Sequence, residues 1–114
     1  MTLQHVVLFS FPIELGPTDE ADMRRQITTW ATAIGGMSVI RFGRPIWTDR
    51  TRGYQYLLYM EFPDAMTLRT YQQHPVHQRF LAWINQRNCT PLAFDYELDS
   101  ATVIHPRPGC ATDL

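Results

Sequence analysis

One tyrosine and two histidines fall within seven residues near the middle of the chain, in the stretch TYQQHPVHQRF at positions 70–80. A neutral imidazole can take a proton near pH 7, and a phenol can donate to a developing oxyanion. Tyr71 and His77 flank Pro75, so the stretch is either a junction between two helices or part of an acid–base site. His74 and His77 resemble a metal pair, but the proline spoils their spacing and no acidic residue converges on them, so we expect no metal.

Two more polar residues lie on predicted strands. His5 shares one side of its strand with Val7 and Phe9, and Tyr56 shares one side of its strand with Leu58 and Met60. If helices cover that side of the sheet, His5, Tyr56, Tyr71 and His77 all point into one layer. The predicted apolar walls of this layer are Val7, Phe9, Ile27, Trp30, Leu58, Met60, Phe80 and Ile84. A mostly apolar cavity with a few convergent polar groups is the usual form of a small-molecule site.

The same polar residues also have ordinary structural interpretations. His5 is equally well explained as a hydrogen-bonded histidine near a terminus. A tyrosine such as Tyr71 on an apolar helix face is usually core, with its hydroxyl reaching the surface. His77 could cap the preceding helix, whereas we place His74 at that helix end, facing outward. Each signal is weak alone, and the argument rests on one fold gathering all of them.

The first part of the chain predicts a strand followed by a helix. Leu3 to Phe11 is rich in β-branched and aromatic residues, which favours a strand. Thr18 is the predicted N-cap of the helix, and acidic residues follow it in the first turn. Met23, Ile27, Trp30 and Ile34 recur on one face, and Gly35-Gly36 ends the helix.

The rest of the chain predicts three strands and a broken helix. The strands are Val39 to Thr48, interrupted by Gly43 and Pro45, then Tyr54 to Phe62, and finally Pro91 to Glu97. The proline in the first of these suggests an edge position or a bulge. Helices are expected from Pro63-Asp64 to about His74 and from Val76 to about Arg87. The order β-α-β-β-α-β is that of an α+β, ferredoxin-like split βαβ unit. We expect one domain over 1–97 and an extended arm or tail over 98–114, which has no periodicity.

Composition narrows the class of protein. The chain has 114 residues, is 45% hydrophobic and carries a formal net charge of −1. Without a basic stripe, nucleic-acid binding is not expected. Cys89 and Cys110 form no spaced pair, so we expect neither a disulfide framework nor zinc. The N-terminal apolar run is too short to span a membrane and lacks a signal-peptide pattern, so we expect a soluble cytoplasmic protein.

Helices on one side of a four-stranded sheet leave the other side bare. That side is also apolar here, carrying Val6, Leu8, Leu57, Tyr59, Leu92 and Phe94. A second copy of the chain is the most economical cover, so we expect a symmetric homodimer with sheet packed on sheet.

Three segments resemble the stress-responsive dimeric α/β-barrel (Dabb) family. They are LQHVVLFSF at the start, GYQYLLYMEFPDAMTLRTYQQHPVHQRF in the middle and LAFDYE near the end, and the similarity covers residues 1–97. Its most specific part is a helix that ends Tyr-x-x-His-Pro-x-His after a strand and Phe-x-Asp. The resemblance implies a dimeric α+β barrel.

The family also implies a chemistry. In its plant polyketide cyclase, a histidine matching His77 is the general base for an intramolecular aldol closure. A tyrosine matching Tyr71 supports it, and a histidine matching His5 lies in the pocket. Two positions differ, because a pocket histidine of that cyclase corresponds to Tyr56 and a pocket tyrosine corresponds to Ile27. The substrate outline is therefore expected to differ as well.

Three functions follow as hypotheses. The leading one is a cofactor-independent acid–base enzyme acting on a small carbonyl compound, most simply a polyketide cyclase. In it His77 removes a proton next to a carbonyl, Tyr71 orients His77 or stabilises the enolate, and His5 and Tyr56 hold a substrate oxygen. The alternatives are a cofactor-independent oxygenase of the antibiotic-biosynthesis type acting on an aromatic substrate, and a non-catalytic dimeric binding or stress protein. No Gly-rich phosphate loop, metal cluster or flavin motif is present, so we expect no cofactor.

Overall fold

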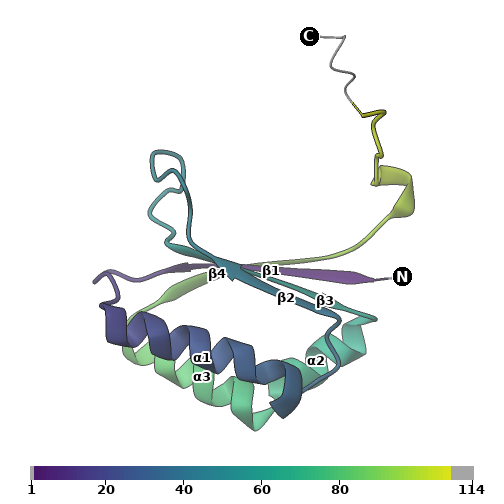
Figure 1. The fold of residues 1–114 in the computed structure, drawn as a ribbon. Coiled ribbons are helices and arrows are strands. Elements are labelled where there is room, and N and C mark those ends of the chain that lie inside the picture. The colour runs from purple at the N-terminus through teal and green to yellow at the C-terminus, as the bar shows by residue number, and fades with distance from the viewer. Residues whose placement is uncertain (1, 109–114) are drawn as a thin grey trace.

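A computed structural model describes residues 2–108 and shows one sheet covered on one side by helices (Figure 1). The elements follow the order β1 (Leu3–Ser10), α1 (Pro17–Ala33), β2 (Val39–Gly43), β3 (Tyr56–Phe62), α2 (Ala65–Gln73), α3 (Pro75–Gln86), β4 (Thr90–Glu97) and a short 3₁₀ turn, η1 (Ser100–Thr102). The ferredoxin-like α+β order predicted from the sequence is confirmed, with the second helix divided into α2 and α3.

The sheet is antiparallel, with strand order β2-β3-β1-β4. The predicted edge position of the second strand is therefore correct, and β4 forms the opposite edge. On β1, His5 lies between Met60 of β3 and Asp95 of β4, while Phe9 lies between Tyr56 and Pro91. Because side chains alternate along a strand, all six point to the same side of the sheet.

The core lies between this side of the sheet and the helices. Its largest fully buried side chains come from every layer: Trp30, Tyr71, Phe9, Phe62, Phe80, Met23, Ile27, Leu58 and Met60. The predicted apolar face of the first helix is confirmed by burial of Met23, Ile27 and Trp30. Full burial of one such side chain stabilises the fold by about 1.5–3 kcal/mol, so this layer holds the helices to the sheet.

Local chain geometry corrects several predicted boundaries. The N-cap of α1 is Gly16, and the predicted cap Thr18 lies inside the first turn, because Pro17 takes the first helical position. The helix ends as predicted, since Gly35 and Gly36 both adopt positive φ angles. β2 stops at Gly43, short of Pro45 and of the predicted end at Thr48.

The C-terminal segment is partly regular. The backbone N–H of Leu98 donates to the carbonyl of Thr2 at 2.8 Å, which extends the pairing of β4 by one residue. η1 follows, capped by the Asp99 side chain, so this part of the expected arm contains a helical turn. Cys110 and the remainder of the expected tail lie outside the described residues.

The opposite side of the sheet carries no helix (Figure 1). Its large apolar side chains are exposed, with Leu57 at 42%, Leu92 at 50% and Phe94 at 67%. This bare apolar side is the one that the sequence predicted.

Candidate active site

The α2–α3 junction is built by two side-chain caps. Asp64 accepts from the backbone N–H of Thr67 at 2.7 Å and begins α2. His74 has extended backbone angles, and its Nδ1 accepts from the backbone N–H of Val76 at 3.1 Å. Pro75 occupies the first position of α3, where a missing N–H costs nothing. His74 is thus a capping residue, and the tight turn fixes where His77 falls on the next helix.

His77 faces the interior from the first turn of α3, with 8% of its surface exposed. Its Nδ1 lies 3.0 Å from the backbone carbonyl of Gln72. A carbonyl only accepts, so Nδ1 carries the hydrogen and Nε2 holds the free lone pair. Burial lowers the pKa of His77 below its usual value, and the neighbouring His5 lowers it further, against an opposing effect of the Gln72 bond. A neutral imidazole with a free Nε2 is the form that a general base requires.

His5 forms a pair with a carboxylate from the edge strand. Its Nδ1 contacts Oδ1 of Asp95, directly across the β1–β4 ladder. The carboxylate accepts, so His5 also presents Nε2 as its free nitrogen. Asp95 therefore fixes the orientation of this ring.

Tyr71 lies beneath the two histidines. Its ring centroid is 4.3 Å from that of His77 and 6.0 Å from that of His5. The side chain is 1% exposed, and its hydroxyl is buried with no hydrogen-bond partner among residues 2–108. Burial and the negative charge of Asp95 raise the pKa of Tyr71, so the phenol remains protonated. An unpaired buried hydroxyl costs free energy, and such a group is often explained by a functional role.

A cleft of about 330 Å³ opens beside the two histidines, between the β1–β4 edge and the two shorter helices, and Tyr71 is not among its lining residues. Five of the predicted site residues line it: His5, Val7, Phe9, His77 and Ile84. Its remaining lining residues are Arg69, Gln72, Gln73, Gln78, Leu81, Pro91 and Ala93. The cleft therefore has an apolar floor, two imidazoles and a polar rim.

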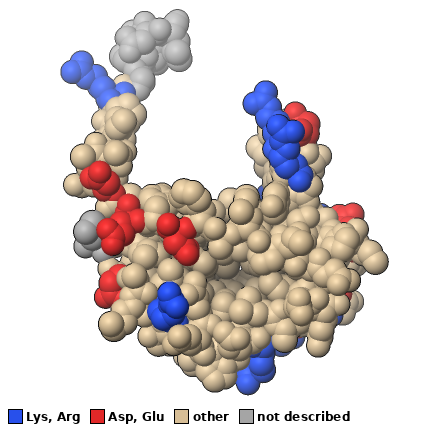
Figure 2. Space-filling view, turned by 180° about the vertical axis from the view of Figure 1, so that it is seen from behind, with Lys and Arg blue, Asp and Glu red and all other residues tan. Residues whose placement is uncertain are grey.

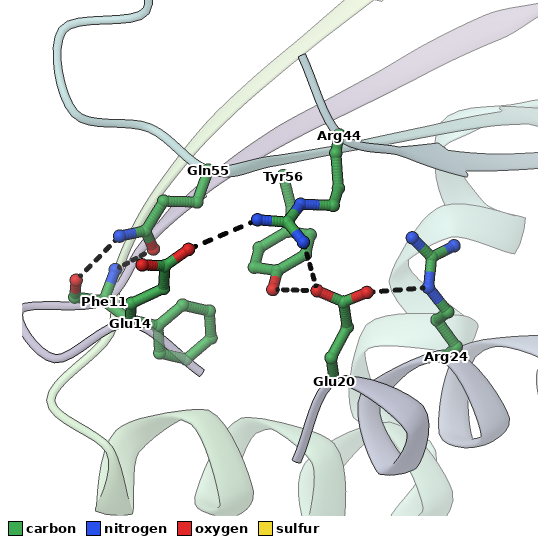
Figure 3. Close-up of polar contacts among 7 residues, drawn as sticks. All are labelled: Phe11, Glu14, Glu20, Arg24, Arg44, Gln55 and Tyr56. Atoms are coloured by element: carbon green, nitrogen blue, oxygen red, sulfur yellow. Dashed lines mark hydrogen bonds and ion pairs between the residues drawn. The ribbon is translucent and has the colours of Figure 1, made fainter. Parts of the chain in front are cut away.

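Tyr56 lies elsewhere in the layer, in a separate polar network (Figure 3). Its hydroxyl donates to Glu20 at 2.8 Å, and Glu20 also receives Arg44 at 3.0 Å and pairs with Arg24 at 3.5 Å. Burial and the bond to Glu20 raise the pKa of Tyr56 to about 12. The predicted proximity of Tyr56 to His5 is not observed, because the two lie at different ends of β1 and β3. Pairing with Glu20 makes Tyr56 a link between α1 and the sheet.

The other predicted wall residues are packed rather than lining the cleft. They are Ile27, Trp30, Leu58, Met60 and Phe80, each at most 1% exposed. Trp30 contacts His77 with its ring centroid at 5.7 Å and Tyr71 at 5.4 Å, so it supports the site from below. The structure thus fills most of the layer and leaves an opening at the β4 edge.

Asp95 and the polar rim were missed from the sequence. The signal for Asp95 was present, since Pro91, Ala93 and Asp95 alternate with Leu92, Phe94 and Tyr96 on the last strand. Only the β1–β4 register, which places Asp95 opposite His5, turns that alternation into a contact. The sequence does not indicate that Arg69 and the three glutamines line a cleft, because their pattern is only that of an exposed helix surface.

Metal ligands do not gather in the described part of the chain. Among residues 2–108, no three His, Cys, Asp or Glu side chains are placed to hold an ion. His74 and His77 direct their Nδ1 atoms to different backbone groups, namely the Val76 N–H and the Gln72 carbonyl. No helix in the same range is long and apolar enough to cross a membrane.

A four-stranded antiparallel sheet covered on one side by helices in the order β-α-β-β-α-α-β is the ferredoxin-like α+β fold. The family model described as the Stress responsive A/B Barrel Domain, Dabb, matches residues 3–98. The chain belongs to this family, which confirms the resemblance seen in the sequence. No curated protein matches it.

Solved structures show the same fold at low sequence identity. A protein from Arabidopsis thaliana has a TM-score of 0.76 and 20% identity, covering 89% of this chain and 99% of its own. The hydroxynitrile lyase of Passiflora edulis has a TM-score of 0.77 and 13% identity, covering 87% and 94%. A dimeric ferredoxin-like protein from Thermobifida fusca has a TM-score of 0.73 and 21% identity, covering 86% and 92%.

Proposed function

We propose that the chain is a cofactor-independent acid–base enzyme acting on a small carbonyl compound, with intramolecular aldol closure of a polyketide as the leading reaction. The observation that carries the proposal is the arrangement of two imidazoles at one cleft. Each holds its Nδ1 on an acceptor, the carbonyl of Gln72 or the carboxylate of Asp95, and keeps Nε2 free. The site residues proposed for catalysis are His77, Tyr71 and His5.

Each proposed step uses a group with the right protonation state. Nε2 of neutral His77 takes a proton from the carbon next to a carbonyl, which leaves an enolate. The protonated hydroxyl of Tyr71 donates to the enolate oxygen. The enolate carbon then attacks a second carbonyl carbon of the same molecule, forming the ring bond, and the resulting alkoxide takes a proton back from His77. His5, oriented by Asp95, contacts a substrate oxygen at the cleft.

Packing limits the substrate that we propose. A filled layer of Trp30, Leu58, Met60 and Phe80 supports entry from the β4 edge rather than through a long tunnel. Tyr56 is then proposed as a wall that closes the other end of the layer, outside the reacting region. Olivetolic acid cyclase, the plant enzyme whose pocket includes a histidine at the position of Tyr56, serves as the model for the reaction class alone.

A second reaction shares the same groups. The Passiflora edulis neighbour is a hydroxynitrile lyase, and Nε2 of neutral His77 is placed to take the hydroxyl proton of a cyanohydrin and pass it to the leaving cyanide. The filled layer supports the third hypothesis, a non-catalytic binding protein, whereas the open cleft supports an enzyme. The oxygenase hypothesis gains no specific support from the site.

We also propose a homodimer formed through the open side of the sheet. Leu57, Leu92 and Phe94 are exposed there, and the Thermobifida fusca neighbour is described as dimeric. We propose a cytoplasmic enzyme without a metal, and no cofactor enters the steps above.

Hydrogen exchange at carbon tests the acid–base proposal without knowledge of the natural substrate. The probe is a short 3,5-diketo thioester in D₂O, with loss of its acidic C–H signals followed by NMR. The protein should accelerate the exchange, and His77→Ala should lower the acceleration by about 10²- to 10⁴-fold. His77→Asn is the matched variant, because its amide can still donate to Gln72 but cannot act as a base.

Two further measurements separate the alternatives. Release of cyanide from mandelonitrile would favour the lyase over the cyclase. If neither probe reacts and His77→Ala binds the diketo thioester as tightly as the unchanged protein, the acid–base proposal fails and the binding-protein hypothesis stands.

A further inference from the structure

Two segments rise from the open side of the sheet, at opposite ends of its strands (Figure 1). The β2–β3 loop is formed by residues 44–55, and the C-terminal arm by residues 98–108. The space-filling view from behind shows the bare sheet side between them (Figure 2). A partner that covers this side must also meet the loop and the arm.

The loop end contains a groove of about 700 Å³. Its floor is apolar and includes Leu8, Leu57 and Leu92 from the open side of the sheet. The described residues around it include four arginines and no acidic side chain: Arg41, Arg44, Arg50 and Arg52. The groove therefore suits a segment that combines apolar side chains with negative charge.

The arm has that composition. Glu97 and Asp99 stand at its base, and Val103 and Ile104 follow η1 with 37% and 77% of their surfaces exposed. Figure 2 shows acidic side chains gathered at the base of the arm and mainly basic ones on the loop, where Asp49 accompanies Arg44, Arg50 and Arg52. Arg107 lies farther along, beyond the apolar pair. Within residues 2–108, neither Arg50 nor Arg52 forms an ion pair with any residue of its own chain.

Symmetry decides which parts of two copies meet. Packing the open sides together requires a two-fold axis that lies between the sheets. An axis along the strands puts the loops of both copies at the same end of the dimer, which gathers Arg50 and Arg52 of both copies there. An axis across the strands puts the loop of each copy at the same end as the arm of the other, so opposite charges gather at each end. Like charges facing each other across an interface are costly, so charge selects the second arrangement.

We propose that the groove under the β2–β3 loop receives the C-terminal arm of a second copy of the chain, and that the exchange is reciprocal. Val103 and Ile104 of each copy cover the apolar floor, while Glu97 and Asp99 lie near Arg50 and Arg52 of the other. This inference rests on the homodimer proposed above and is independent of the acid–base chemistry.

Charge reversal tests the contact. The loop variant Arg50→Glu with Arg52→Glu and the arm variant Glu97→Lys with Asp99→Lys each place like charges at both copies of the contact. Sedimentation velocity should show each variant dimerising about tenfold or more weakly than the unchanged chain, with the difference shrinking at high salt. A chain with all four changes should recover the original affinity, because its reversed loop meets a reversed arm.

Recovered dimer affinity in the four-change chain would exclude local structural damage as the cause of weaker dimerisation. Asp99→Lys also removes the cap of η1, but loss of a cap cannot be repaired by changing Arg50 and Arg52. The control is Arg25→Glu with Arg79→Glu, two exposed arginines on the helix side of the molecule, which gives the same change in net charge as the loop variant. This control should dimerise like the unchanged chain.

The remaining outcomes overturn the proposal. If the unchanged chain dimerises but the loop and arm variants do so equally well, the groove has another occupant, such as a small anionic ligand, and the dimer proposal survives alone. Equal weakening by the helix-side control, or no recovery in the four-change chain, also rejects it. A monomeric unchanged chain rejects the arm exchange and the dimer together, whereas the deuterium exchange assay reports on the acid–base site in every case.

Discussion

Tyr71 poses a problem at the scale of single residues, because its hydroxyl is fully buried and has no partner in the described chain. The ring alone explains the packing against His77 and Trp30, so phenylalanine would pack as well. A buried hydroxyl without a hydrogen bond costs about 1–3 kcal/mol. The side chain therefore makes sense if the hydroxyl serves a ligand.

The substitution Tyr71→Phe separates these two roles. Removing the hydroxyl without opening a void should raise the free energy of unfolding by about 1 kcal/mol, because an unsatisfied polar group is lost. The same change should slow deuterium exchange of the diketo probe. Thermal unfolding followed by circular dichroism gives the first number and NMR the second. A variant that is less stable and equally active would show that the hydroxyl has a structural bond and no catalytic one.

Protonation of His77 should set the pH dependence of the exchange rate and contribute to that of the stability. Burial lowers its pKa from the usual 6.5 in the folded protein. The exchange rate depends on the neutral form, so it should rise with pH through this lowered pKa, with a midpoint below pH 6.5. Stability follows the same direction: the unfolded chain binds the proton more readily, so the contribution of His77 is complete above pH 6.5 and declines as the pH falls toward the lowered pKa. NMR titration of the ring checks this, and a midpoint above 6.5 would contradict it.

At the scale of elements, the junction between α2 and α3 is set by His74 and Pro75. His74→Ala removes the side-chain acceptor for the backbone N–H of Val76 and should destabilise the fold by about 1 kcal/mol, whereas His74→Asn should retain the cap. Because His74 does not line the cleft, both variants should keep the exchange activity. Urea unfolding measures the stability difference. If His74→Asn folds normally but loses activity, His74 rather than His77 is the general base.

The sequence predicted the elements well and their ends less well. The sequence pattern placed every strand and α-helix but not η1, because apolar spacing reports which side of a longer element is buried. Local chemistry moved the ends: Pro17 took the first helical position and left Thr18 inside the helix, and Gly43 ended β2 before Pro45. Such choices depend on a few backbone groups, which periodicity does not report.

The sequence predicted which face of its strand or helix each site residue lies on. It did not predict whether the side chain reaches the cleft or is covered by its neighbours. His5, Val7, Phe9, His77 and Ile84 face the cleft because they lie near the β4 edge. Leu58, Met60 and Trp30 point to the same layer but are sealed by their neighbours. Tyr56 shares the side with His5 yet binds Glu20, a contact between strand and helix that the sequence does not indicate.

At the scale of the whole molecule, the two sides of the sheet have different roles in our proposals. The helix side holds the core and the cleft, so its apolar residues are already covered. Leu57, Leu92 and Phe94 are exposed on the open side, and a single copy of the chain cannot bury them. A stable interface typically removes about 1,600 Å² of surface from water, and this side is where such an area is available.

One charge placed on the open side should therefore separate the copies. Phe94 points away from the helices and is 67% exposed, so Phe94→Glu should leave the core intact while introducing a charge into the apolar interface. Light scattering should show the unchanged chain as a dimer and the variant as a monomer at micromolar concentration. Met66→Glu is the matched control, because Met66 is 79% exposed on α2, on the helix side. If both variants remain dimeric, the copies meet through another surface. If both become monomeric, the helix side contributes to the interface as much as the open side does. Either result contradicts packing through the open side of the sheet alone.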